Sequence, residues 1–404
     1  MDRRTYLSAV GVVVAGALAG CAARGPNDTG SDRPDRGGDD PGDGGPEKFA
    51  VETVAEGLEH PWGIALLPDE DRLLLTERDA GRLSLVDLKG GRREPIEGTP
   101  EVYSGGQGGL LDVAIHPAFP EEPWVYLSYS AANDAGASST HLGRGRLDPE
   151  NARLSTFESL HAAEPFVDSD GHYGSRIVFG TDGAIYQSVG DRQFKDFGPD
   201  HVAQDPSNEL GTILRLAPDG SIPEDNPFTG ESGIPDTIFS YGHRNPQGLA
   251  VHPRTGEIWE AEHGERDGDE INVLEGGGNY GWPVATYACE YGTDEPVGDR
   301  PDERDEFVEP VHYWECGSGG FPPSGAAFYD GEAFPEWRGD LFVGNLAGEY
   351  LGRFVVDGRG VRERKPLLAD RGWRIRAIES ASDDGHLYVA IDDDPGPLVR
   401  LVPR

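Results

Sequence analysis

The chain has 404 residues, with 73 Asp plus Glu against 35 Lys plus Arg and a formal net charge of −38. A surface this negative repels phosphate backbones and anionic lipids, which argues against a nucleic-acid-binding protein and against electrostatic docking on membranes. A hydrophobic content of 36%, with 7 Trp, 14 Tyr and 15 Phe, excludes a largely disordered chain. Molar salt screens such self-repulsion, so we expect a salt-adapted, haloarchaeal source; an ordinary acidic protein is the alternative.

The first residues are typical of an export signal. Arg3-Arg4 precede an apolar run, Ala9–Ala19, that is shorter than the roughly 20 residues needed to span a bilayer. The paired arginines favour the twin-arginine route. Leu18–Cys21 has the form of a lipobox, so we expect residues 1–20 to be removed and Cys21 to carry lipid. A plain signal peptide with an incidental cysteine is the alternative.

Residues 21–47 are mostly Gly, Pro and Asp with little to bury, and they predict a disordered acidic tether. Residues 48–404 are then expected to form one folded domain. The signal and the tether together indicate an exported protein, held by lipid on the outer face of the cytoplasmic membrane. Outside the cell Cys289 and Cys316 can form a disulfide, and a bonded or a free pair both stay open.

From Phe49 onward the sequence shows short strand patterns and almost no helical periodicity, in a chain with 58 Gly and 32 Pro. A repeated unit begins with an apolar strand, predicted near residues 62–64, 111–113, 176–178, 248–250, 326–328 and 376–378. Second strands are predicted near 73–75, 124–127, 184–186, 257–259, 341–343 and 387–389. Third strands are predicted near 83–86, 213–216, 270–273, 350–354 and 398–401.

Six such units predict an all-β fold, a six-bladed β-propeller. Ala50–Val54 is expected to close the ring as an added strand. A β-sandwich array is the structural alternative, although six units of these lengths fit one closed ring better.

One candidate catalytic pair follows from strand order. His172 stands just before a predicted strand, and Asp191 stands at the end of the next one. In an antiparallel pair those two ends lie side by side. A carboxylate beside a His orients the ring and stabilises its protonated form, so such a His is suited to act as a general base. A surface His–Asp pair without function is the alternative.

Other polar segments interrupt the strand pattern. Gln107 lies between glycines, and Arg244 and Asn245 lie in a segment rich in hydrogen-bonding side chains that suits an anionic ligand. Residues 262–270 contain clustered carboxylates, Asp269 among them, which suit Ca²⁺. Arg374 and Arg376 are two residues apart and are expected on one face of a strand, with an anion or carboxylates between them. The serine-hydrolase elbow GxSxG, the Walker A motif, HExxH and the GxGxxG fingerprint are absent.

The chain from about Ala50 to Arg404 resembles the soluble PQQ-dependent glucose and aldose sugar dehydrogenases, the glucose/sorbosone dehydrogenase family. The motifs that carry the resemblance are GQGGLLDVAIHPAF, HYGSRIVFGTDGAIYQSVGD, DGSIPEDNPF, YGHRNPQGLA, EHGERDGDEINVLEGGGNYGWP and PPSGAAFY, in this order. The resemblance implies a six-bladed propeller with pyrroloquinoline quinone (PQQ) and Ca²⁺ on one face. It implies oxidation of aldoses to lactones, with electrons passed to an external acceptor, since the chain has no CxxCH haem motif.

The resemblance also implies a role for each candidate residue. His172 would be the general base, Asp191 would orient it, and Gln107 would hold the reacting hydroxyl. Arg244 and Asn245 would contact the quinone, with Arg244 stabilising the oxyanion. The remaining assignments are cofactor binding by Arg374, Arg376 and His263, calcium binding by backbone oxygens of Gly264 and Glu265, and further calcium contacts by Asp269, Glu270 and Tyr280.

The sequence departs from the family pattern at two positions. Glu265 replaces a usual Pro, where a carbonyl oxygen can still bind calcium. Ala347 replaces a Lys that helps to hold the cofactor in the glucose dehydrogenases, and Arg374 and Arg376 can compensate. Two other functions are alternatives: a calcium-dependent, lactonase-like hydrolase, which would have a ring of metal-binding side chains, and a non-catalytic propeller that binds a sugar or a partner.

Overall fold

The structure, a computed structural model, describes residues 49–68, 71–382 and 384–404. The predicted signal peptide, Cys21 and the predicted tether lie outside the described residues. The described residues belong to one compact unit. Among the residues that the structure describes, none of the helices has the length and apolar character needed to cross a bilayer.

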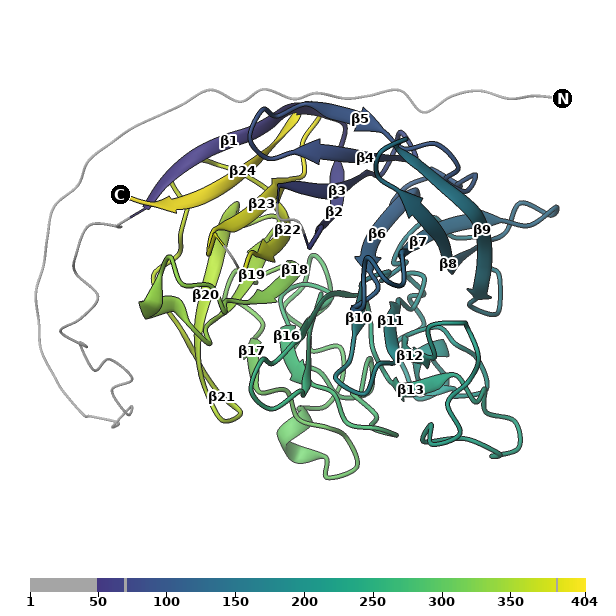
Figure 1. Ribbon diagram of the computed structural model, residues 1–404. Coiled ribbons are helices and arrows are strands. Elements are labelled where there is room, and N and C mark those ends of the chain that lie inside the picture. The colour runs from purple at the N-terminus through teal and green to yellow at the C-terminus, as the bar shows by residue number, and fades with distance from the viewer. Residues whose placement is uncertain (1–48, 69–70, 383) are drawn as a thin grey trace, which may run out of the picture. The chain divides into compact units, whose positions relative to one another are not determined.

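The described residues form six four-stranded antiparallel sheets, the blades of a β-propeller (Figure 1). The strands of the first three blades are, in chain order, β2 (Pro61–Leu66), β3 (Arg72–Glu77), β4 (Arg82–Asp87), β5 (Arg93–Pro95); β6 (Leu110–Ile115), β7 (Trp124–Ala132), β8 (Ser138–Asp148), β9 (Arg153–Ala162); and β10 (Ile177–Phe179), β11 (Ile185–Val189), β12 (Thr212–Leu216), β13 (Ile238–Tyr241).

The other three blades are built in the same way. Their strands are β14 (Pro246–Val251), β15 (Ile258–Glu262), β16 (Asp269–Val273), β17 (His312–Trp314); β18 (Pro323–Phe328), β19 (Leu341–Asn345), β20 (Tyr350–Asp357), β21 (Gly360–Glu363); and β22 (Ile375–Ser380), β23 (Leu387–Ile391), β24 (Gly396–Pro403), with β1 (Phe49–Leu58). The described residues also form three short 3₁₀ helices, η1 (Val202–Gln204), η2 (Pro301–Glu303) and η3 (Pro335–Trp337).

The predicted six-bladed propeller is confirmed, and so is its closure. β1 pairs antiparallel with β24, so the start of the domain supplies the outer strand of the last blade. The innermost strands contact one another in sequence around the axis, from β2 through β6, β10, β14, β18 and β22 and back to β2. Closing the sheets into a ring leaves fewer free inner edges to pair with other chains.

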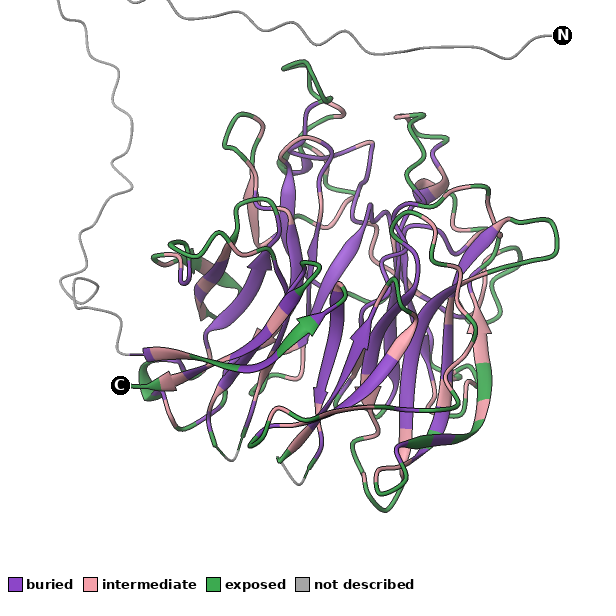
Figure 2. Cartoon of the chain, turned by 90° about the horizontal axis from the view of Figure 1, so that it is seen from above, coloured by how far each residue is buried: buried purple, intermediate pink, exposed green. Residues whose placement is uncertain are grey.

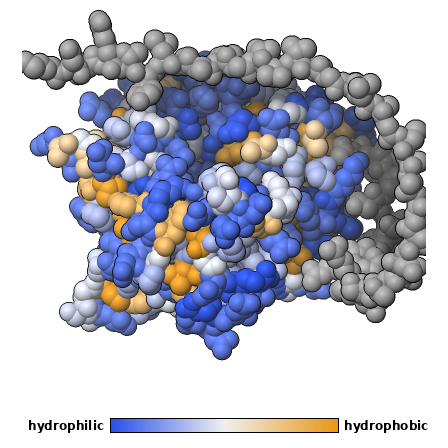
Figure 3. Space-filling model, turned by 180° about the vertical axis from the view of Figure 1, so that it is seen from behind, coloured by the Kyte–Doolittle hydropathy of each residue, from blue (hydrophilic) through white to orange (hydrophobic). Residues whose placement is uncertain are grey.

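Apolar side chains pack between neighbouring blades. Leu74 and Leu85 of the first blade pack with Val113 and Leu127 of the second, and equivalent clusters join the other neighbours. Figure 2 shows that the strands are largely buried and that exposed residues gather in the loops. Seen from behind, hydrophilic residues cover much of the surface, with smaller hydrophobic areas between them (Figure 3).

The topology places loops from all six blades around one end of the axis. In each blade the first strand begins, and the second strand ends, at the same end of the sheet because the two strands are antiparallel. His172 and Arg374 precede first strands, whereas Gln193 and Asp392 follow second strands. These four side chains line one cavity.

Candidate active site

A cavity of about 700 Å³ lies at this end of the axis. That volume lies within the range of small-molecule sites. Its lining includes predicted site residues from the second, third, fourth and sixth blades, namely Gln107, His172, Arg244, Asn245, His263, Gly264, Glu265, Asp269, Arg374 and Arg376. Asp191 lies directly behind His172, while Glu270 and Tyr280 line a separate small cavity that also touches Arg244 and Gly264.

The structure brings His172 and Asp191 together. Nδ1 of His172 lies 2.6 Å from Oδ1 of Asp191, and both side chains are buried. Oδ2 of Asp191 accepts a hydrogen bond of 2.8 Å from the indole N–H of Trp282. With Nδ1–H directed at the carboxylate, the lone pair of Nε2 is left for the cavity.

Burial and charge keep the His172 ring neutral. Burial lowers the pKa of His172, the charge of Arg244 lowers it further, and Asp191 opposes both. Burial by itself would raise the pKa of Asp191, but the charge of His172 and their hydrogen bond, followed by Arg244, lower it overall. The result is an ionised carboxylate behind a neutral imidazole, which is the protonation state that a general base needs.

Backbone geometry fixes the loop that carries His172. His172 has a φ of 43°, in the left-handed region. A Cβ at Gly190 would lie 2.2 Å from the carbonyl oxygen of His172, so only glycine permits this approach. Oε1 of Gln107 accepts the backbone N–H of His172 at 2.9 Å, and Oδ1 of Asn245 accepts that of Gly174 at 3.1 Å. Two predicted ligand-binding amides therefore also position the base.

Arg244 is held from several sides. Its Nη2 lies 2.6 Å from Oε2 of Glu265, a carboxylate that Lys195 also contacts, at 2.5 Å. Its backbone N–H donates to Glu262 at 2.6 Å. Its Nε is buried and has no partner within the described part of the chain. An unpaired guanidinium N–H at a cavity wall favours an acceptor on a bound ligand.

Arg376 and Arg374 share the carboxylate of Asp392. Arg376 is buried and pairs with Oδ2 of Asp392, and Nη2 of Arg374 lies 4.0 Å from the same atom. A carboxylate thus lies between the two arginines, as the sequence predicts. Arg374 itself lies just before β22 rather than on it, because the strand begins at Ile375. Its half-exposed side chain donates to the carbonyl of Leu346, next to Ala347.

His263 belongs to the same wall. Its Nε2 lies 3.2 Å from Oε1 of Gln247, which also accepts from Nη1 of Arg376 at 2.8 Å. Burial lowers the pKa of His263 well below its ordinary value, and the neighbouring charges of Arg244, His172 and Arg376 add to this. His263 is therefore a neutral donor or acceptor in the cavity.

The loop after β15 has the features of a cation site. No hydrogen-bond donor in the described residues contacts the carbonyl oxygens of Gly264 and Glu265. Both oxygens of Asp269 accept backbone N–H groups, from Gly264 at 3.0 Å and from Phe321 at 2.7 Å. Burial raises the pKa of Asp269 to about 6. Asp269 therefore anchors the loop whose free carbonyls suit a hard cation.

Glu270 and Tyr280 lie together behind this loop. Burial, then repulsion from Glu262, raises the pKa of Glu270 well above its usual range. The Tyr280 hydroxyl donates to the carbonyl of Val273 at 2.8 Å and accepts the backbone N–H of Glu275 at 2.8 Å. This phenol is engaged in the fold, so a metal contact from Tyr280 would come from its backbone carbonyl.

Sequence reasoning missed several residues of the site. Lys195, Trp282 and Asp392 had no assigned role, yet they contact Glu265, Asp191 and the paired arginines. Trp62 was noted only as a strand residue, but its ring packs beneath the guanidinium groups of Arg176 and Arg376 at 4.2 and 5.8 Å. The signal in the sequence is weak for Lys195, Trp282 and Trp62, because their partners lie far away in the chain. Asp392 follows the next strand, only 16 residues after Arg376, so this pair has the same signal as His172 and Asp191.

The two cysteines of the propeller are bonded to each other. Cys289 and Cys316 form a disulfide across a sequence separation of 27. The backbone of Cys289 pairs with that of Arg266, and Nη2 of Arg266 lies 3.4 Å from Sγ of Cys316. The disulfide therefore supports the loop that carries Gly264 and Glu265.

The fold and the site together define a β-propeller with a cavity on its axis. The cavity has a His–carboxylate pair among cationic side chains. Such an arrangement can take a proton from a polar substrate that is bound beside an anionic group. The family model for glucose/sorbosone dehydrogenase matches residues 58–400, and the chain belongs to this family. It is accordingly an oxidoreductase of the sugar dehydrogenase kind, a class that acts on a sugar and needs an electron acceptor.

Individual proteins agree with this assignment. Aldose sugar dehydrogenase YliI of Escherichia coli (strain K12) is 38% identical, over 89% of this chain and 94% of its own. A crystal structure of glucose dehydrogenase is 41% identical, covers 87% of this chain and 99% of its own, and superimposes with a TM-score of 0.81. The PQQ-bound aldose sugar dehydrogenase from Streptomyces coelicolor is 28% identical, with coverages of 89% and 99% and a TM-score of 0.71.

Proposed function

We propose that this protein oxidises aldoses at the anomeric carbon to lactones, using PQQ and Ca²⁺, and passes the electrons to an external acceptor. The observation that carries the proposal is the neutral His172, oriented by Asp191 at the wall of a cation-rich cavity. The PQQ-bound Streptomyces relative supports the choice of cofactor.

The cavity fits a cofactor that bears several carboxylates. Arg244, Lys195, Arg374 and Arg376 line it in a chain that is otherwise strongly acidic. The unpartnered Nε of Arg244 offers a donor, and the free carbonyls of Gly264 and Glu265 offer oxygen ligands for calcium. When bound, PQQ would supply the quinone carbon that accepts a hydride, and Ca²⁺ would act on it as a Lewis acid.

The chain's own residues would act on the sugar. Nε2 of His172 takes the proton from the anomeric hydroxyl, and Asp191 stabilises the imidazolium that forms. Gln107 has its Oε1 committed to the His172 backbone, so its Nε2 amide protons remain for the sugar oxygen. Arg244 stabilises negative charge that develops beside it.

A reconstitution experiment tests the proposal. The full chain in molar salt is mixed with PQQ and Ca²⁺, quinone binding is followed by absorbance, and dye reduction is followed with a panel of sugars. We expect stoichiometric quinone binding and reduction with at least one aldose. Quinone binding without turnover on any sugar, or no quinone binding, would reject the assignment.

The calcium-dependent lactonase is disfavoured because the cavity is lined by His and Arg side chains rather than by a ring of metal ligands.

We also propose that the protein is exported and anchored through Cys21, and that it is adapted to high salt. The N-terminal sequence and the net charge of −38 support these proposals. In Cys21→Ser we expect the protein to move from the membrane fraction to the soluble fraction; membrane retention of this variant would contradict lipidation.

Removing salt is expected to unfold the wild type, with partial protection by Ca²⁺. Full stability in dilute buffer without Ca²⁺ would contradict salt adaptation.

A further inference from the structure

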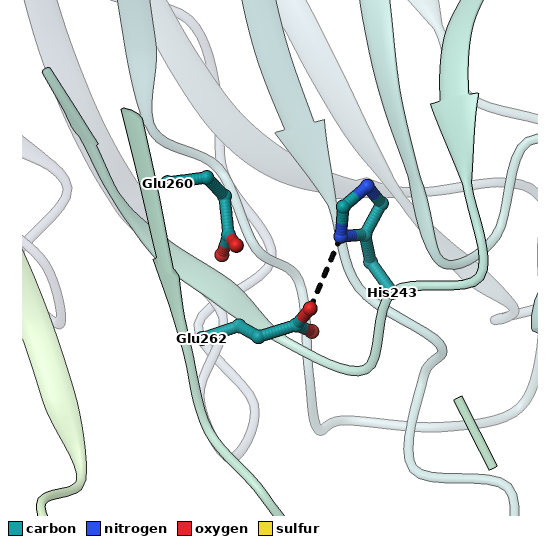
Figure 4. A group of neighbouring side chains, drawn as sticks. All are labelled: His243, Glu260 and Glu262. Atoms are coloured by element: carbon teal, nitrogen blue, oxygen red, sulfur yellow. Dashed lines mark hydrogen bonds and ion pairs between the residues drawn. The ribbon is translucent and has the colours of Figure 1, made fainter. Parts of the chain in front are cut away.

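A second group of metal-ligating side chains lies in the fourth blade, behind the cavity wall. Glu260 and Glu262 are alternate residues of β15, so they project from the same face of the sheet. His243 approaches them from the loop before β14 (Figure 4). One ligand atom from each of the three lies within 4.8 Å of the others, and all three residues are buried. Ligands around a single ion are about 3 to 5 Å apart when each bond is 2.0–2.4 Å.

The cluster contains polar atoms that the protein leaves unpaired. Oε2 of Glu260 accepts from Nδ2 of Asn272, its cross-strand neighbour, at 3.0 Å. Oε1 of Glu260 and Oδ1 of Asn272 have no partner within the described residues, although the two residues are 1% and 0% exposed. A buried, unpaired carboxylate oxygen is costly and calls for a ligand or a proton.

The charge on the cluster is also not balanced by a basic side chain. Oε1 of Glu262 lies 3.1 Å from Nδ1 of His243, and Oε2 accepts the backbone N–H of Arg244 at 2.6 Å. Across the described part of the chain, no Lys or Arg side chain forms an ion pair with Glu260 or Glu262. Two carboxylates buried side by side repel each other unless one takes up a proton or a cation lies between them.

His243 can serve as a ligand without losing its other contact. Its Nε2 lies 2.9 Å from Oγ of Ser240. When Nε2 carries the proton and donates to Ser240, the lone pair of Nδ1 points toward the Glu262 carboxylate. Two lone pairs facing each other are repulsive unless a cation accepts both.

We propose that His243, Glu260 and Glu262 bind a buried divalent cation, with the Asn272 amide turned to offer its oxygen. An imidazole together with carboxylates favours Zn²⁺ or Mn²⁺ over Ca²⁺, which prefers oxygen ligands alone. The site is distinct from the calcium positions considered above, because it uses neither Glu270 nor the carbonyls of Gly264 and Glu265. Through the bond from Glu262 to the Arg244 backbone, the ion would brace the loop that carries Arg244 and Asn245.

The test uses the full chain without quinone, so that its result does not depend on the proposed activity. The protein is stripped with a chelator and titrated with Zn²⁺, Mn²⁺ or Ca²⁺ alone, and bound metal and the midpoint of thermal unfolding are measured. The variants are Glu260→Gln, which keeps the side-chain shape, and Glu270→Gln, which removes the carboxylate across the strands from Glu262 but none of the proposed ligands. Glu231→Gln is the control, since this acid is exposed in the loop between β12 and β13 and is not part of the cluster.

We expect the wild type, Glu231→Gln and Glu270→Gln each to bind one equivalent of Zn²⁺ or Mn²⁺. Glu260→Gln should bind the metal more than about 100-fold more weakly, because even changes outside the ligand shell lower metal affinity about 10–100-fold. The metal should raise the unfolding midpoint of the wild type but not that of Glu260→Gln. If Glu260→Gln does not fold, His243→Gln replaces it with the same readouts. Equal binding and equal thermal response in wild type and variant would overturn the site, and binding of Ca²⁺ alone would overturn His243 as a ligand.

Discussion

Nδ1 of His172 lies 2.6 Å from Oδ1 of Asp191, in a buried contact between the entry to β10 and the end of β11. This one hydrogen bond selects the ring tautomer, directs Nε2 to the cavity and keeps a negative charge behind the ring. Gly190 permits the contact, because any larger residue there would collide with the His172 carbonyl.

The pH dependence of Asp191→Asn tests the electrostatic part of this relationship. Burial and Arg244 lower the pKa of His172 and Asp191 raises it, so removing the carboxylate should lower the pKa of His172 further. The acidic limb of kcat/KM should therefore move to lower pH. At the same time kcat should fall about 10²–10⁴-fold, because the tautomer and the imidazolium lose their support. An acidic limb that moves to higher pH would contradict the assigned charges.

Trp282→Phe tests the outer part of the same network. The variant removes the N–H that donates to Oδ2 of Asp191 at 2.8 Å, and leaving a buried acceptor unpaired costs about 1–3 kcal/mol. We expect lower stability together with a fall in kcat, while KM for the sugar changes little. Trp337→Phe is the control, because this buried indole packs in the fifth blade away from the cavity. Comparable kinetic loss in both variants would mean that Trp282 acts only through packing.

Glu265→Gln tests how the cavity balances its cations. Glu265 neutralises Arg244 and Lys195, and it repels an anionic cofactor. Loss of its charge should tighten PQQ binding about 5–10-fold, an energy in keeping with charges about 4 Å apart that are screened as in bulk water. Calcium affinity should remain, because the carbonyls of residues 264 and 265 persist. Absorbance titration of PQQ at fixed Ca²⁺ measures the first effect, and a marked loss of Ca²⁺ binding would show that the carboxylate itself is a ligand.

The Cys289–Cys316 disulfide should contribute to stability. It closes a loop with a sequence separation of 27, for which the entropy lost by the unfolded chain corresponds to about 2–4 kcal/mol. Urea unfolding of the double Cys→Ser variant should show this loss in the free energy of unfolding. Reductant should lower the stability of the wild type to the same level and leave the variant unchanged. Equal stability of wild type and variant would exclude a stabilising role.

The sequence predicts the inner strands of the blades better than the outer strands. First and second strands of every blade contain a short apolar run, so they are visible without a structure. The outer strands β5 and β9 were not predicted, because their residues are mostly exposed or half-buried and carry no apolar alternation. β8 was missed although many of its residues are buried, because Ser, Thr and Gly fill much of it.

The same limit applies to the site. His172 and Asp191 could be paired from the sequence because they belong to neighbouring strands of one blade. Trp282 reaches Asp191 across 91 residues, and Lys195 reaches Glu265 across 70. Such contacts depend on how blades are placed around the axis, which strand patterns do not specify.

The most direct measurement of the central claim compares wild type with His172→Asn in the reconstituted assay. Asn tolerates the left-handed backbone at this position but cannot accept the proton. The account predicts that kcat for aldose-dependent dye reduction falls about 10²–10⁴-fold while absorbance titration shows nearly unchanged PQQ binding. Full activity of His172→Asn with bound PQQ would contradict the assignment of His172 as the base.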